Sequence, residues 1–286
     1  KLGTWYPMGG MHKIIEAFEK IALEQGVNIV RGAEVKSLEY DGNRVSKAIT
    51  TKGEYTSDVF LSGADYAHTD QKILGTKANY SDKYWDKRVM APSSLLFYVG
   101  LDKKVDGLKH HNLFFDAPFD QHGQEIYKDP KWPENPLFYV CCPSKTDDSV
   151  APEGKENLFF LIPLAPDLKD DPKQHEKYFD MLCERIEKRT GENIKPNIIY
   201  KRSYCIDDFK SDYHAFKGNA YGLANTLKQT AILKPRLMHK TLRNFYYTGQ
   251  LTVPGPGVPP SIVSGEVVAK QIIKDLKSAK PKEYAK

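Results

Sequence analysis

The tract YYTGQLTVPGPGVPPSIVSGEVVAKQIIKDL, residues 246–276, limits the possible folds of this chain more than any other stretch. It reads as a strand, then a turn stiffened by prolines, then a helix that begins with small residues. Such a unit brings free backbone N–H groups and the positive end of a helix dipole to one point, where an anion can bind. The glycines that keep this point free of bulky side chains are Gly249, Gly255, Gly257 and Gly265. A tight structural turn that binds nothing is the alternative reading of the spacing.

Composition narrows the class of protein. The chain has 286 residues, 40% of them hydrophobic, which suffices for one large domain or two smaller ones. Its net charge of +5 is too small and too dispersed to indicate a nucleic-acid partner, but it is compatible with an anionic membrane surface. The longest apolar runs fall well short of the roughly 20 residues that a membrane-spanning helix needs. There is no HExxH motif, and the four cysteines lack metal-binding spacing, so we expect no metal.

The pattern along the chain predicts alternating helices and sheets. A helix over 11–26 precedes an antiparallel meander that ends at Gly63-Ala64-Asp65, with Asp41-Gly42 and Lys52-Gly53 as hairpin turns. Apolar strands of a second sheet follow at 93–101, 112–116, 136–143 and 156–166. A helix over 171–191, a strand within 197–209 and a loop-like stretch over 213–231 lead to the terminal unit.

These segments predict a divided α/β architecture. Residues 1–72 and 236–286 form one α/β unit, and residues 73–235 form a sheet-based insert with helices.

Several motifs together resemble one protein family. The terminal tract fits Y-x-x-G-x-x-T-x-P-G-x-G-x-P with a Ser-Gly pair beyond it, and resembles the C-terminal flavin-binding motif of the bacterial-type phytoene desaturases. These are FAD-dependent carotenoid dehydrogenases among the amine-oxidase-like flavoproteins. GTWYPMGGMHKIIEAFEKIALEQGVNI is similar to their internal G-x-x-x-P-x-G-G segment and its helix. SSLLFYVGLDKK, SVAPEGKENLFFLIPLAP and HAFKGNAYGLANTLKQTAILKPR also resemble the family, so the likeness runs along essentially the whole chain.

The resemblance implies part of a Rossmann-like FAD-binding domain with an inserted mixed-sheet substrate-binding domain of the α+β type. Residues 1–72 and 236–286 are then FAD-domain segments, and residues 73–235 bind the substrate. The family's N-terminal GxGxxG unit, which takes the FAD pyrophosphate, is absent from this sequence. The chain also opens with Lys1 rather than Met, so we expect that the N-terminal portion lies outside the sequence.

The resemblance also implies contacts with FAD. Gly249 and Gln250 end the last strand beside the pyrophosphate or ribityl chain. Gly257, Val258 and Pro259 lie against the isoalloxazine edge with backbone N–H groups available to the ring. Ser261 and Ser264 cap or line the helix start. The Val35 backbone meets the adenine, and Pro7, Gly9 and Gly10 bring the chain close to the flavin.

The implied reaction is FAD-dependent desaturation of phytoene or a related carotenoid, with the hydride passing to the flavin and quinone or oxygen reoxidising it. Burying each CH₂ of such a hydrocarbon is worth about 0.8 kcal/mol, so the substrate must come from a bilayer. We therefore expect a cytoplasmic protein held peripherally on the inner face of the cell membrane, with PLFYVCCP or NLFFDAPF as docking segments.

No catalytic acid or base is identified from the sequence. His110-His111 and Asp207-Asp208 are adjacent pairs whose side chains would point to opposite faces of a strand, and we expect both pairs to be solvated loops. His68 follows a strand end and is equally open.

Three other functions remain open. One is a redox-neutral carotenoid cis-trans isomerase on the same flavin scaffold. The second is an amine oxidase-like flavoenzyme, which would need an aromatic cage from Tyr246 and Tyr247. The third is a non-catalytic carotenoid-binding protein.

Overall fold

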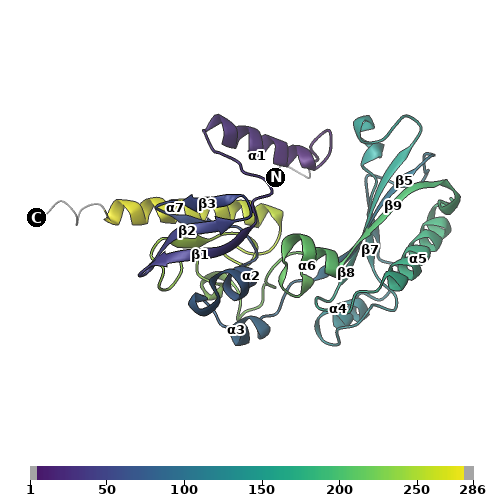
Figure 1. The fold of residues 1–286 in the computed structure, drawn as a ribbon. Helices are drawn as coiled ribbons and strands as arrows, with labels where there is room; N and C mark the ends of the chain where they lie inside the picture. The colour runs from purple at the N-terminus through teal and green to yellow at the C-terminus, as the bar shows by residue number, and fades with distance from the viewer. Residues whose placement is uncertain (1–4, 280–286) are drawn as a thin grey trace, which may run out of the picture. The chain divides into compact units, whose positions relative to one another are not determined.

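The computed structural model describes residues 5–279, and they form two compact units (Figure 1). Unit 1 comprises the chain up to Val30 together with Ser93–Ile206. Unit 2 comprises Arg31–Pro92 together with the chain from Asp207 onward.

Unit 1 is built on a five-stranded sheet in the order β6-β7-β8-β5-β9, in which every pair of neighbours is antiparallel. The strands are β5 (Ser93–Leu101), β6 (His111–Phe114), β7 (Phe138–Cys141), β8 (Glu156–Leu164) and β9 (Ile198–Tyr204). The helices of the unit are α1 (His12–Glu24), α4 (Phe119–Tyr127) and α5 (Pro172–Thr190). Three-residue 3₁₀ turns lie at Pro143–Lys145, Asp148–Val150 and Lys195–Asn197.

Helix α5 covers one face of this sheet (Figure 1). Burial alternates strictly along β8, as expected of a strand with one face in a core. Leu182 and Ile186 of α5 are fully buried against that face. Asp171 caps the helix by accepting from the Lys173 N–H at 2.9 Å, and Gly191 ends it in the left-handed conformation, as the sequence predicts.

Unit 2 contains two small sheets. The antiparallel meander has the order β1-β2-β3, with β1 (Val35–Asp41), β2 (Arg44–Thr50) and β3 (Gly53–Thr56). A second sheet pairs β4 (Phe60–Ser62) with β10 (Phe245–Tyr247) in parallel. The helices are α2 (Tyr66–His68), which continues as a π-helix (Thr69–Leu74), α3 (Asp82–Asp86), α6 (Ile206–Tyr213), which starts at the unit boundary, and α7 (Val258–Ala279). Short 3₁₀ turns lie at Gly75–Lys77, Phe216–Gly218 and Ala231–Leu233.

A buried carboxylate organises the core of unit 2. Tyr66 stacks on Tyr247 with ring centroids 3.6 Å apart, and both side chains are almost fully buried. Asp70, also fully buried, accepts from the Tyr247 hydroxyl (3.1 Å), the Trp85 indole (3.0 Å) and the Asn79 backbone N–H (2.9 Å). This core fixes β10 beside the segment that follows β4.

The structure corrects several sequence-based expectations. β4 (60–62) is not part of the antiparallel meander. It pairs instead with β10, and the pairing is parallel. The unit boundaries fall at 30/31, 92/93 and 206/207 rather than at 72/73 and 235/236. The five-stranded sheet is antiparallel rather than mixed, and the parallel pairing occurs in unit 2. The assignment of FAD-binding and substrate-binding roles to segments stays a prediction.

Two contacts hold the N-terminal segment against the rest of unit 1. The Gly9 N–H donates to Asp147 at 2.6 Å, and Tyr6 packs edge-on against His110 with ring centroids 4.7 Å apart. Within the described residues, no helix is both long enough and apolar enough to span a bilayer.

Candidate functional site

The carboxyl ends of β4 and β10 lie side by side because the two strands are parallel and in register. The Thr248 N–H donates to the Ser62 carbonyl at 3.0 Å and extends the ladder by one bond. A glycine comes next in each of the two segments, Gly63 after β4 and Gly249 after Thr248. We call these two residues the glycine rim. A Cβ placed on Gly249 would meet no described heavy atom nearer than the Gly63 carbonyl oxygen at 4.0 Å. The rim is therefore bare backbone at the sheet edge where α/β folds bind ligands.

One buried hydroxyl ties the loop after the rim to helix α7. Ser264 Oγ accepts from the Gly249 N–H at 3.0 Å and shares hydrogen bonds with the hydroxyls of Thr248 (3.0 Å) and Thr252 (2.7 Å). Thr252 closes the turn by donating its N–H and its hydroxyl to the Gly249 carbonyl, at 3.0 and 2.8 Å. Gly249 has a φ of +107°, which only glycine adopts readily. Ser264 thus holds the loop rather than capping the helix.

The start of α7 offers few donors. Val258 is the first helical residue and is 65% exposed. Pro259 has no N–H and presents only its ring. Ser261 donates both its N–H (3.0 Å) and its hydroxyl (2.8 Å) to the Gly257 carbonyl, so its hydroxyl turns back into the helix. Backbone hydrogen bonds in the described chain leave the N–H groups of Gly257 and Val258 for a ligand.

Gln250 is held by a neighbouring loop. Its Nε2 donates to Asn219 Oδ1 at 3.4 Å, and the same oxygen accepts from the Gly222 N–H at 2.6 Å. A Cβ on Gly222, which has a φ of +99°, would come within 2.5 Å of the Gln250 carbonyl oxygen. The loop over 219–222 therefore lies directly against the segment that follows the rim, and only glycine fits there.

A cavity of about 320 Å³ adjoins the rim on the side of the meander. It is mainly apolar, and its lining includes Gly63, the exposed Leu61 of β4, and Val35 at the start of β1. This volume lies at the lower end of the range for small-molecule sites. The structure thus brings Val35 and Gly63 of the rim to one cavity, and the contact of Val35 with adenine stays a prediction.

Titratable groups lie just beyond Gly63. Asp65 caps α2 by accepting from the N–H of His68 (3.0 Å) and from that of Phe216 (3.2 Å). Burial raises the pKa of Asp65 to about 6, although both backbone donors oppose that shift. The His68 ring stacks on His214 with centroids 4.1 Å apart, and burial together with the His214 charge lowers the pKa of His68. His68 is therefore neutral at pH 7.

Sequence reasoning missed a buried amine beside the proline- and glycine-rich stretch 254–260, which we call the Pro/Gly turn. Lys234 is only 5% exposed, and its Nζ has no hydrogen-bond partner in the described chain. The amine would lie 3.4 Å from a Cβ on Gly255, and Asn225 Oδ1 would lie 3.2 Å from the same Cβ. Burial lowers the pKa of Lys234, since a charge without a partner is poorly solvated there. The only sequence signal is a lysine set between an apolar Ile-Leu pair and a proline.

The other residues singled out in the sequence lie in different local settings within their own units. In unit 1, the Gly10 N–H donates to the Pro7 carbonyl at 3.1 Å and forms a turn. Asp207 and Asp208 lie in the first turn of α6, so the prediction of a loop is wrong for them.

Two further expectations fail on geometry. His110 precedes β6, and its ring packs against that of His111 with centroids 4.3 Å apart, so the two rings do not point to opposite faces. Tyr246 and Tyr247 are buried, and their hydroxyls donate to Asp275 and Asp70. They are therefore core residues and cannot form an exposed aromatic cage.

Comparison with known proteins gives consistent matches. The family model described as flavin containing amine oxidoreductase matches residues 1–273. A carotenoid 3,4-desaturase of Haloarcula japonica is 38% identical over 279 residues, which cover 96% of this chain and 56% of that protein. A zeta-carotene-forming phytoene desaturase of Myxococcus xanthus is 30% identical over 279 residues, covering 95% of this chain and 53% of that protein. The chain thus spans about half the length of the curated relatives it matches.

A solved structure supports the fold. The crystal structure of an oxidoreductase from Methanosarcina mazei matches with a TM-score of 0.61 at 15% sequence identity. The match covers 92% of this chain and 55% of the other. Together with the match to the flavin-containing family, this likeness confirms the α/β class with a Rossmann-like flavin fold.

Proposed function

The chain belongs to the flavin-containing amine oxidoreductase family, and from that membership we propose that it is part of an FAD-dependent carotenoid desaturase. FAD is the cofactor of the family, and the motif resemblance to carotenoid dehydrogenases agrees with the carotenoid enzymes among its relatives. The substrate class follows from those relatives. Phytoene itself is a narrower proposal, because the relative at 38% identity is named for desaturation at another position.

The observation that carries the proposal is the glycine rim together with the loop that Ser264 ties to helix α7. FAD fits this part of the chain because the rim is bare backbone, a ligand-sized cavity adjoins it, and the following helix start keeps two donors. We propose that Gly249 and Gln250 line the pyrophosphate or ribityl chain, and that Val35 meets the adenine from β1.

The Pro/Gly turn would hold the ring system. Gly257 and Val258 supply N–H groups, while Pro259 and Ser261 give shape without donors, since one lacks an N–H and the other bonds to Gly257. Lys234 adds a positive charge beside Gly255, which favours the electron-rich end of an isoalloxazine. Its missing partner is a reason to expect an acceptor there.

Bound FAD supplies a hydride acceptor for a saturated carbon–carbon unit of the substrate. The residues of this chain would orient the ring through backbone donors and keep water away from it. Asp65, with a pKa of about 6, and neutral His68 are titratable groups beyond the rim, but no contact assigns either of them as a base.

We also propose that the protein docks on a membrane surface, where its substrate and a quinone acceptor would be found. Three large apolar side chains at and beyond the edge strand β6 support this: Leu113 (65% exposed), Phe115 (59%) and Phe119 (67%). PLFYVCCP does not serve, because Phe138 and Val140 of that segment are core residues. Insertion of these side chains into lipid would be worth about 1.5–3 kcal/mol each at full burial.

Vesicle flotation tests the docking proposal. Phe115→Ser with Phe119→Ser should lower binding to anionic vesicles at least about tenfold, because each 1.4 kcal/mol is a factor of ten. Ile199→Ser is the matched control, since this residue is 56% exposed elsewhere in the same unit. Equal losses for both variants, or no loss, would reject Leu113–Phe119 as the docking segment.

Product analysis tests the reaction. The protein at its full natural length is incubated with FAD and liposomes that carry either phytoene or a carotenoid saturated at the 3,4 position. New double bonds in either arm support desaturation and identify the preferred substrate. An all-trans product without added double bonds would favour the isomerase instead. Carotenoid extraction from vesicles without any conversion would favour a carrier.

The amine oxidase alternative has lost its structural basis in this chain, because Tyr246 and Tyr247 are buried. Amine oxidation with no effect on either carotenoid would nevertheless restore it.

A further inference from the structure

A cluster of soft ligand atoms lies at one end of the β6–β7 pair in unit 1. His111 and Cys141 are direct partners in the antiparallel register, and the Cys142 N–H donates to the His110 carbonyl at 2.8 Å. One ligand atom each from His110, His111 and Cys141 lies within 4.8 Å of the other two. We propose that these three residues bind a transition-metal ion, with Zn²⁺ as the expected ion. This proposal is independent of the flavin site.

The donor set and its spacing suit zinc. Two imidazole nitrogens and one thiolate are ordinary zinc ligands, at about 2.0–2.1 Å for nitrogen and about 2.3 Å for sulfur, so tetrahedral ligands lie roughly 3.3–3.8 Å apart. The observed upper limit of 4.8 Å is within reach of small side-chain rotations. Three protein ligands leave a fourth position for water, which is the pattern of an open rather than a closed zinc site.

Hydrogen bonds already orient both imidazoles. His110 Nδ1 is paired with the Thr146 hydroxyl at 2.5 Å, while its Nε2 is buried without a hydrogen-bond partner in the described chain. His111 Nδ1 is paired with the Tyr139 hydroxyl at 2.6 Å. Metal-binding histidines typically have one ring nitrogen fixed in this way while the other binds the ion. The unpartnered Nε2 of His110 is the atom whose burial a metal would explain.

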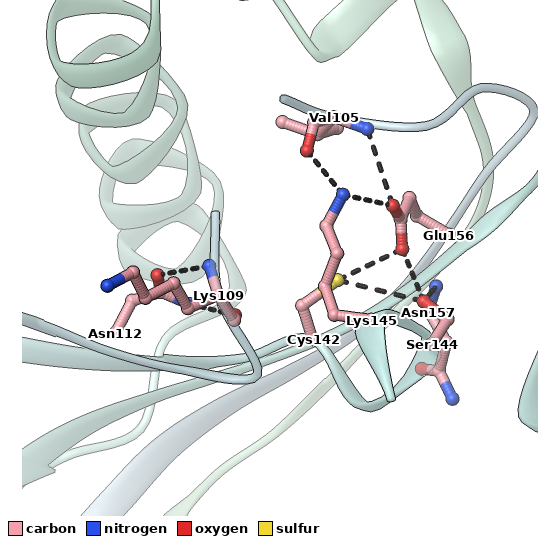
Figure 2. Close-up of polar contacts among 8 residues, drawn as sticks. All are labelled: Val105, Lys109, Asn112, Cys142, Ser144, Lys145, Glu156 and Asn157. Atoms are coloured by element: carbon pink, nitrogen blue, oxygen red, sulfur yellow. Dashed lines mark hydrogen bonds and ion pairs between the residues drawn. The ribbon is translucent and has the colours of Figure 1, made fainter. Parts of the chain in front are cut away.

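Side-chain contacts fix the residues that adjoin the cluster in sequence, and Figure 2 shows those of Lys109, Asn112 and Cys142. Asn112 spans the two histidines by donating to the Lys109 carbonyl at 2.6 Å and accepting from the Lys109 N–H at 2.8 Å. Directly after β7, the Cys142 thiol donates to the buried carboxylate of Glu156 at 3.0 Å, and that carboxylate is also paired with Lys145 at 2.7 Å. Cys141 and the histidines therefore project from segments that have little freedom to move apart.

A second group of similar composition provides a contrast. Asp170, His175 and Cys205 also bring their ligand atoms within 4.8 Å of one another. There, however, His175 uses both nitrogens, with Asp170 at 2.6 Å and with the Ser203 hydroxyl at 3.2 Å. Neither nitrogen of His175 is left to bind an ion, so this group is a satisfied core network.

Cobalt titration tests the proposal, because a thiolate bound to Co²⁺ gives a charge-transfer band in the near ultraviolet. The full chain, stripped of metal by a chelator and kept reduced with a phosphine, should bind one equivalent of Co²⁺ with that band, and Zn²⁺ should displace it. Cys141→Ser should abolish the band although Cys142, Cys183 and Cys205 remain. Thr146→Val should weaken binding by about 10–100-fold through loss of orientation of His110.

His111→Gln is the variant least able to disturb folding, because His111 is exposed, and it should weaken binding at least as much as Thr146→Val. His12→Gln, an exposed histidine on α1, is the matched control and should leave binding unchanged. Circular dichroism checks that each variant is folded. The proposal is overturned if the wild-type chain shows no saturable binding at one equivalent, or if folded Cys141→Ser keeps the band, or if His111→Gln binds as tightly as His12→Gln.

Discussion

Replacing Ser264 by alanine tests whether one hydroxyl holds the ligand-facing loop. Ser264 is fully buried and connects Gly249, Thr248 and Thr252 through contacts of 3.0, 3.0 and 2.7 Å. Alanine removes all three contacts and fills the site with a methyl group. We expect the loop after the glycine rim to open more readily while the helix itself persists.

The magnitude follows from the groups left behind. The two threonine hydroxyls have other partners or can bond each other, so they lose little. The Gly249 N–H loses its acceptor, which costs about 1–3 kcal/mol in a buried position. Alanine regains up to about 0.5 kcal/mol of helix propensity. The expected net loss is about 2 kcal/mol, which corresponds to roughly a 30-fold change in an equilibrium constant.

Amide exchange and urea unfolding measure this effect. The Thr252 N–H donates to the Gly249 carbonyl, so its exchange should accelerate about 30-fold if it exchanges by local opening. Ser261→Ala is the matched control in the same helix, because that hydroxyl only supplements a backbone bond to Gly257, and it should change stability by less than about 0.5 kcal/mol. If both variants behave alike, Ser264 does not hold the loop.

Four further substitutions in the same unit give three tests. Gly222→Ala should lower the free energy of unfolding in urea by about 3 kcal/mol or more, because it combines a positive φ with a clash at a backbone oxygen. Gly265→Ala has open space around it and should raise the stability by up to about 1 kcal/mol. The pKa of Asp65 is about 6 in the folded protein against an ordinary value of 3.8, so its contribution to stability is present below pH 4 and is lost as the pH rises through 6. Asp65→Asn should remove this pH-dependent decline in the free energy of unfolding, which is at most about 3 kcal/mol. An unchanged pH profile of stability would contradict the burial argument. Burial lowers the pKa of Lys234, so the wild type loses stability as the pH falls and the amine becomes charged. Lys234→Met should therefore raise the stability at pH 7, yet it should weaken FAD binding in the full-length protein. A loss of both stability and FAD binding would show that the amine has a structural partner.

The sequence by itself determined the local elements. The strand–turn–helix tract, the cap and stop of α5, and the hairpin turns of the meander depend on residues close together in the chain, and they form as predicted. The family and its flavin could also be inferred from motifs that lie within short stretches. Candidate residues such as Val35 and Gly249 came from the same source. In the structure, Val35 lines the cavity beside Gly63, and the Gly63 carbonyl oxygen lies 4.0 Å from a Cβ placed on Gly249.

Only the tertiary structure decided which distant segments meet. β4 looks like a fourth meander strand in sequence, but it pairs with β10 more than 180 residues later, and only this pairing creates the glycine rim. In sequence, Ser264 reads as a residue that caps or lines the helix start, and the burial of Lys234 became known only from the fold. Cys141 lies 30 residues from His111 without any recognisable ligand spacing, and the two meet because β6 and β7 are in register. Local propensity fixes short-range geometry, whereas strand pairing and burial depend on the free energy of the whole packed unit, which no single stretch of sequence encodes.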